Sequence, residues 1–167
     1  KETTAKKKTH PLKTIKILCR NKYFILITLA FAVIYTSLGL TGGSRIYYAK
    51  YVLGDEMLNS TMTMFNYIPT ILTIMLIPVF TKRFGKIKAL FVGFLFYAAG
   101  LVLEIAGPVN LPMIYTGLVL QGIGHAALYS CLFAIVGDVV DYSEWKDGVR
   151  EEGITYSVTS FGQKIGT

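Results

Sequence analysis

Residues 113–137, MIYTGLVLQGIGHAALYSCLFAIVG, make up an apolar segment without Asp, Glu, Lys or Arg. A helix needs about 17–25 predominantly apolar residues to cross the hydrocarbon core of a bilayer, so this segment is long enough. Other stretches free of these four residue types lie earlier in the chain, at 23–44, 57–81 and 89–103. The sequence therefore predicts an all-α integral membrane protein with transmembrane helices at about 23–47, 57–80, 87–105 and 113–136.

The composition agrees with this class of protein. Hydrophobic residues make up 53% of the chain and charged residues 16%, whereas about 25% of a soluble domain is charged. A further apolar segment, 154–167, predicts the start of a fifth helix. The chain has no initiator Met and ends inside this segment, so we expect an internal fragment of a longer protein, with 23–167 forming a partial transmembrane bundle.

Basic residues alternate between the connecting segments. Eight lie in 1–22 and four in the loop 82–88, whereas the loop near Pro108 has none. Such alternation follows the positive-inside rule, which places the N-terminus, the loop 82–88 and the loop 138–152 in the cytoplasm of a cell with this protein in its plasma (inner) membrane. We interpret 1–22 as a basic cytoplasmic linker that contacts anionic lipid, and the net charge of +7 does not indicate a nucleic-acid partner.

Polar residues recur at helical spacing within two of the apolar segments. Gln121, His125 and Tyr129 lie at i, i+4 and i+8 and share one face. In a membrane helix such a face is expected to point to the bundle interior or to a water-filled cavity. Amide, imidazole and hydroxyl groups can bind a sugar, although hydrogen bonding between helices is the alternative. A similar stripe, for which helix packing is the favoured interpretation, comprises Asn66, Thr70 and Thr73.

The segment 138–152 carries six acids and two bases, the reverse of an ordinary cytoplasmic loop. Asp138, Asp141 and Trp145 share a helical face at i, i+3 and i+7. Such acids can pair with bases on the cytoplasmic side and separate when a transporter opens. A solvated loop is the alternative. The predicted cytoplasmic gate comprises Asp138, Asp141, Tyr142, Glu144, Arg150 and Glu151.

Lys164 lies about three turns into the predicted fifth helix, with Ser157 and Ser160 on the same face. A Lys inside a span costs about 2.5–3.5 kcal/mol on insertion scales, unless it faces an acid or water. We therefore predict that Lys164 binds substrate or couples it to an ion, with an acidic partner in a part of the protein outside this chain. Snorkelling to the membrane surface is the alternative.

The sequence shows no sign of an enzyme. It has no phosphate-binding loop, no Cys/His spacing for a metal and no nucleophile elbow, and a lone His125 does not make a catalytic site. Cys19 and Cys131 lie far apart, so neither a disulfide nor a metal site is expected. No cofactor and no metal are predicted.

The run D-x-x-D-Y-x-E-x-K-x-x-x-R-x-E-[GS]-x-x-Y-S, from Asp138 to Ser157, resembles the signature of the glycoside–pentoside–hexuronide:cation symporters. The end of the first span, Tyr47-Tyr48-x-x-Tyr51-Val52-Leu53-Gly54-Asp55, is also similar to that family. The loop 82–88, TKRFGKIK with its flanking residues, resembles the R-x-G-[RK] loop of the major facilitator superfamily, in which the Gly allows a tight turn.

This resemblance implies twelve helices in two halves, of which the chain would supply the central linker, helices seven to ten and the start of eleven. Substrate would then bind near the midplane, between these helices and a missing N-terminal half. By the same resemblance, the essential Lys of helix eleven is Lys164 and an aromatic sugar contact is Tyr129. Thr159 replaces a family Gln near the sugar.

The implied function is symport of a sugar or glycoside, xyloside- or glucuronide-like, driven by sodium or protons through alternating access. One alternative is a lysolipid symporter of the same superfamily. Another is a non-transporting sensor or assembly subunit, for which the charged segment 138–152 would be a docking surface.

Overall fold

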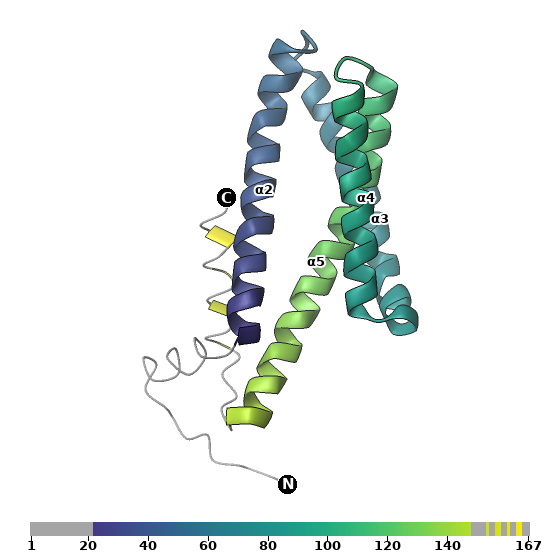
Figure 1. Ribbon diagram of the computed structural model, residues 1–167. Coiled ribbons are helices and arrows are strands. Elements are labelled where there is room, and N and C mark those ends of the chain that lie inside the picture. Colours follow the sequence, from purple (N-terminus) through teal and green to yellow (C-terminus); the bar gives the residue numbers. More distant parts are fainter. Residues whose placement is uncertain (1–21, 148–152, 154–155, 158–159, 161–162, 165–167) are drawn as a thin grey trace. The chain divides into compact units, whose positions relative to one another are not determined.

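The computed structural model describes residues 22–147 together with residues 153, 156, 157, 160, 163 and 164. Most of the predicted linker 1–22 and most of the predicted fifth helix 154–167 lie outside the described residues. The described chain contains helices α2 (Lys22–Tyr51), α3 (Leu58–Phe84), α4 (Lys86–Ala106) and α5 (Leu111–Asp147) (Figure 1). All four are long and apolar enough to cross a membrane, which confirms the predicted all-α membrane fold.

The chain divides into two compact units. The first combines residues 1–37 with 136–167, and the second consists of residues 38–135. The second unit holds the end of α2, all of α3 and α4, and most of α5.

Helix α5 is longer than its apolar segment. We expected the span to end near Val136 and a loop to follow, but the helix continues to Asp147. The loss of hydrophobicity after Val136 marks where apolar residues end and not where the helix ends, because an α-helix satisfies its own backbone hydrogen bonds in water as in lipid. Residues 138–147 are therefore helical, and their charged side chains sit on a continuous helix.

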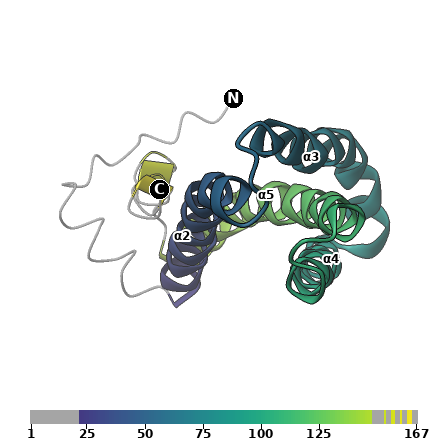
Figure 2. The same ribbon diagram turned by 90° about the horizontal axis from the view of Figure 1, so that it is seen from above.

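Helix α5 lies between α3 and α4 in the second unit (Figure 2). In its apolar window 56% of residues are buried, compared with 17% in each of the other helices. Glycines permit the close approach: a Cβ added to Gly124 would lie 2.6 Å from the carbonyl oxygen of Gly93, and Gly117 faces Gly100 in the same way. Helices in lipid pack tightly where such small residues meet, because the backbones can then come into van der Waals contact.

The turn between α3 and α4 is a single residue, Gly85, with φ of +86°. Its N–H donates to the carbonyl oxygen of Thr81 at 2.9 Å, and the Lys86 ammonium donates to the carbonyl oxygen of Ala134 at 3.3 Å. Residues with a Cβ rarely adopt a positive φ, so glycine is the residue that suits this turn. The predicted tight turn at the R-x-G-K sequence is confirmed.

Candidate functional site

The polar stripe of α3 connects two helices. The Asn66 side-chain amide donates to the carbonyl oxygen of Leu118 at 3.2 Å. The Thr70 hydroxyl oxygen lies 2.7 Å from the Asn66 carbonyl oxygen and 3.0 Å from that of Gly122, so one proton is shared between two acceptors. Asn66 and Thr70 are both buried. Of the two interpretations of this stripe, the described contacts favour helix packing, because these groups are already engaged with α5.

The polar stripe of α5 lies against α4. Gln121 is 0% exposed and His125 is 6% exposed, while Tyr129 is half-buried. The His125 ring centroid lies 4.8 Å from that of Tyr97 on α4 and 5.7 Å from that of Tyr129. The three stripe residues thus share one face, as their spacing predicted. Because Gln121 is fully covered in this arrangement, its contact with a substrate stays a prediction.

Beside this stripe, the structure brings together two charged residues that our sequence analysis did not select. Arg45 of α2 and Glu104 of α4 attract each other electrostatically, and both line a cavity of about 440 Å³. The Gln121 amide lies next to the Glu104 carboxyl. Among the described residues, no hydrogen bond of standard geometry joins these two groups.

A signal for this pair was present in the sequence. Arg45 and Glu104 carry opposite charges and each precedes a predicted loop on the same side of the membrane. The predicted spans 23–47 and 87–105 already contained both residues near their ends, but we did not single them out because each lies at the edge of an uncharged stretch. The helices end slightly later, at Tyr51 in α2 and at Ala106 in α4.

In the first unit, the predicted gate residue Tyr142 belongs to an aromatic cluster. Its ring packs edge-on against Tyr23 of α2 at 5.0 Å between centroids and lies 5.9 Å from Trp145. The ammonium groups of Lys22 and Lys146 lie over the rings of Tyr23 and Tyr142, at 5.0 Å and 5.8 Å from the centroids. These contacts tie the start of α2 to the end of α5.

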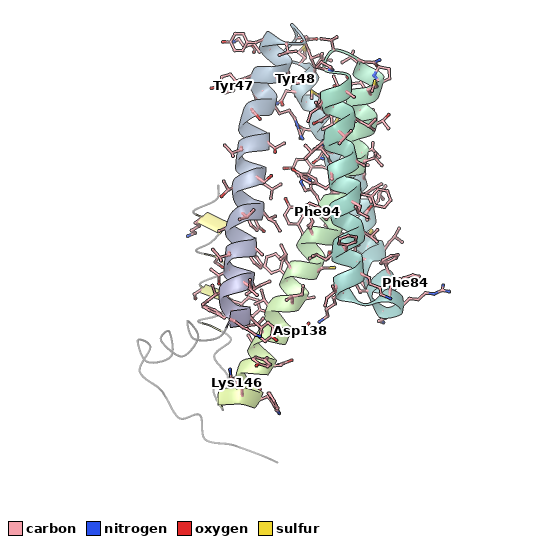
Figure 3. The ribbon with its side chains drawn as sticks, viewed as in Figure 1. Tyr47, Tyr48, Phe84, Phe94, Asp138 and Lys146 are labelled. Carbon is pink, nitrogen blue, oxygen red and sulfur yellow. The ribbon has the colours of Figure 1, made fainter. Side chains whose placement is uncertain are left out.

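The remaining gate residues are only partly described. Asp138, Asp141 and Glu144 are exposed on the last turns of α5, where Figure 3 labels Asp138 and Lys146. Arg150 and Glu151 lie outside the described residues. The gate therefore stays a prediction.

Lys164 lies beside a cavity of about 380 Å³ that is also lined by Tyr156, Ser157 and Ser160. The two serine hydroxyls donate to the carbonyl oxygens of Gly153 and Tyr156, each at 2.7 Å, which leaves their oxygens free to accept from a ligand. This cavity brings Lys164 and the two serines together, as the shared helical face predicted. The predicted site residue Thr159 lies outside the described residues.

Within the described part of the chain, no group of three His, Cys, Asp or Glu side chains could hold a metal ion.

Comparison with known proteins identifies relatives over most of the chain. The family of MFS/sugar transport proteins matches residues 1–167. A putative sulfoquinovose importer of Salmonella typhimurium is 32% identical over 94% of this chain and 34% of its own length. An isoprimeverose transporter of Lactiplantibacillus pentosus is 29% identical, over 99% of this chain and 35% of its own.

A third relative is a glucuronide carrier protein homolog of Escherichia coli K12. It is 30% identical over 93% of this chain and 34% of its own length. The chain spans about a third of the length of these curated relatives. No solved structure matches the chain.

Proposed function

Because this chain belongs to the family of MFS/sugar transport proteins, we propose that it is part of a multi-pass transporter that carries a sugar or glycoside together with a cation. Proteins of this family are transporters and not enzymes, as the resemblance to the glycoside–pentoside–hexuronide:cation symporters predicted. The names of the relatives, a sulfoquinovose importer, an isoprimeverose transporter and a glucuronide carrier, support a sugar or glycoside as substrate.

The observation that carries the proposal is the cavity at Lys164. An ammonium group, a phenol and two hydroxyl oxygens line one open pocket, in which all four side chains are exposed. Lys164 donates to ring or hydroxyl oxygens of the sugar, and Ser157 and Ser160 accept from sugar hydroxyls. A charged donor contributes about 1.5–3 kcal/mol to such a hydrogen bond, more than a neutral one.

The coupling ion, the membrane orientation and the gate complete the proposed transport cycle. Sodium or a proton binds in the N-terminal half that completes the bundle, and its charge is coupled to substrate through Lys164. The N-terminus and the loop 82–88 face the cytoplasm of the plasma membrane, where the gate at Asp138 and Tyr142 opens and closes in alternating access. Lipid surrounds the exposed apolar faces of α2, α3 and α4.

The test uses the full-length protein in energised membrane vesicles. Uptake of labelled methyl β-xyloside and methyl β-glucuronide is followed with and without a sodium gradient, and with and without an uncoupler. The variant Lys164→Ala should lower uptake by about tenfold or more, as the loss of a charged hydrogen bond predicts. The matched control is Lys88→Ala, at an exposed lysine in the first turn of α4, and this variant should transport normally.

Three results would overturn the proposal. Uptake in Lys164→Ala equal to that of the wild type would remove Lys164 from the transport site. A wild-type protein that takes up a lysolipid but neither glycoside would be a lysolipid symporter. A wild-type protein that takes up none of these compounds would fit a non-transporting sensor or assembly subunit.

A further inference from the structure

A second cavity lies between the ends of α2, α3 and α4, and its two charged residues were not among the predicted site residues. Its volume of about 440 Å³ falls within the range of about 300–1,000 Å³ that small-molecule sites occupy. Its lining includes Arg45, Tyr48, Met62, Glu104, Ile105 and Pro108. All of these residues belong to the second unit, so the cavity is a feature of one compact body.

The position of Arg45 sets this cavity apart from a surface ion pair. At 1.5 Å per residue, Arg45 lies about 9 Å before the end of α2 at Tyr51, whereas Glu104 lies about 3 Å before the end of α4 at Ala106. Arg45 and Glu104 are both half-buried. Charges in a span are expensive and, as a rule, face a water-filled cavity or a functional partner. A purely structural role is therefore the less economical explanation of two opposite charges that line an open pocket.

Arg45 and Glu104 attract each other electrostatically but do not form an ion pair. They attract each other, but no nitrogen–oxygen distance within 4.0 Å connects them. By comparison, the exposed pair Lys50–Glu56 at the end of α2 is closed at 2.6 Å. Both side chains line the same cavity, so a ligand with both donors and acceptors can bridge them.

Neighbouring polar groups can also contact a ligand in this cavity. The Tyr48 hydroxyl, in the last turns of α2 (Figure 3), donates to the Pro108 carbonyl, which leaves its oxygen as an acceptor. Behind Glu104, the fully buried Gln121 amide lies next to the carboxyl without a hydrogen bond of standard geometry. A ligand that draws Glu104 toward this amide would complete that hydrogen bond, and a completed bond lowers the cost of burying the amide.

We propose that Arg45 and Glu104 form a subsite that binds adjacent hydroxyl groups of an uncharged glycoside. One sugar hydroxyl donates to the Glu104 carboxylate and its neighbour accepts from the Arg45 guanidinium. Met62, Ile105 and Pro108 supply the apolar part of the lining against the C–H surface of the ring. This inference rests on the proposed function, whose site at Lys164 it extends by a second, separate sugar contact.

The balance of charge gives the subsite its selectivity. The charges of Arg45 and Glu104 sum to zero. The carboxylate of a uronide would be attracted by Arg45 and repelled by Glu104, so it would gain no net electrostatic advantage over a neutral sugar. Removing the Glu104 charge leaves Arg45 alone and turns the subsite into one that prefers anions. Specificity of this kind is a difference between two affinities, which a single substitution can reverse.

The experiment measures binding by calorimetry and uptake by vesicles for the same full-length protein. The probes are methyl β-xyloside, which is neutral, and methyl β-glucuronide, which is anionic. Glu104→Gln should weaken binding of the xyloside by about tenfold while binding of the glucuronide is kept or strengthened, as loss of one charged hydrogen bond predicts. Glu56→Gln, at an acid in an exposed ion pair, is the matched control and should leave the preference unchanged.

A double variant, Arg45→Met with Glu104→Met, separates binding from folding. It removes both charges at once, so it should insert and fold, which melting of the purified protein checks, and it should still lose binding of the xyloside. Wild-type affinity and selectivity in this double variant would overturn the subsite and leave a structural charge pair. So would a Glu104→Gln variant with unchanged preference.

The two proposals fail in different ways. Binding of the xyloside with the expected effects of Glu104→Gln, but no uptake, would overturn the transport function and leave the subsite. Ion-driven uptake with no change of preference would overturn the subsite and leave the function. A wild-type protein that binds neither glycoside would overturn both.

Discussion

The Asn66 side chain donates a 3.2 Å hydrogen bond to the backbone carbonyl of Leu118, which ties α3 to α5 within the apolar spans. One turn along, Thr70 lies 3.0 Å from the carbonyl oxygen of Gly122. The carbonyls of α5 at these positions already accept helical bonds, so each gains a second donor. Polar side chains inside the bundle thus act between helices before any ligand is considered.

Replacing Thr70 by Val keeps the shape of the side chain and removes its hydroxyl. We expect a loss of about 0.6 kcal/mol, with an upper bound of about 1.7 kcal/mol, as measured for hydrogen bonds between membrane helices. Thermal unfolding of the purified protein in detergent measures this loss of stability. Thr73→Val is the control, because Thr73 makes no hydrogen bond among the described residues. Glycoside uptake should be the same in both variants, and loss of uptake in Thr70→Val alone would revive the substrate interpretation of the stripe.

Gly124→Val should destabilise the packing of α4 on α5. A Cβ at Gly124 would lie 2.6 Å from the Gly93 carbonyl oxygen and 2.7 Å from the Tyr97 backbone nitrogen, and backbone atoms cannot move away easily. Overpacking of this kind costs about 1–3 kcal/mol. The melting temperature measures the loss.

Gly137→Val is the matched control for that substitution. A Cβ at Gly137 meets nothing within 4 Å, so only the small difference in helix propensity remains. Equal melting temperatures for the two variants would show that α4 and α5 do not approach each other at Gly124.

Gly85→Ala should strain the turn between α3 and α4. Its φ of +86° and ψ of 158° lie in a region that is essentially restricted to glycine, and residues forced into it cost about 1–3 kcal/mol. Gly43→Ala is the control, since Gly43 lies in helix α2 with open space around its Cβ position. A Gly85→Ala protein that melts at the wild-type temperature would contradict this turn.

Tyr23 and Tyr142 should be coupled energetically. Their rings meet edge-on at 5.0 Å, and aromatic pairs of this geometry contribute about 0.5–1.5 kcal/mol beyond their buried area. A double-mutant cycle with Tyr23→Leu and Tyr142→Leu, measured by unfolding, gives the coupling. The comparison is a second cycle with Tyr23→Leu and Trp145→Leu. Trp145 is 81% exposed and packs against Tyr142, so its coupling energy with Tyr23 should be smaller. Additive effects for Tyr23 and Tyr142 would show that the contact adds no stability.

Much of the fold could be predicted from local patterns. The uncharged stretches located four membrane helices, since the hydrocarbon thickness fixes how many apolar residues a span needs. The glycine within Arg83–Lys86 predicted the tight turn. Spacing along one helix predicted that Gln121, His125 and Tyr129 share a face, and that Ser157, Ser160 and Lys164 lie together. The end of α5 was missed, because hydropathy falls at Val136 while the helix continues to Asp147.

The sequence by itself determined which segments are membrane helices and which of their residues share a face, because both properties depend on neighbours within a few turns. Only the tertiary structure decided what each face meets: α5 carbonyls for Asn66 and Thr70, and a common cavity for Arg45 and Glu104. The physical reason is that nearly uniform apolar spans contain little information about the rotation of a helix about its axis. Close approach of glycines such as Gly100 and Gly117, which lie on different helices, fixes that rotation.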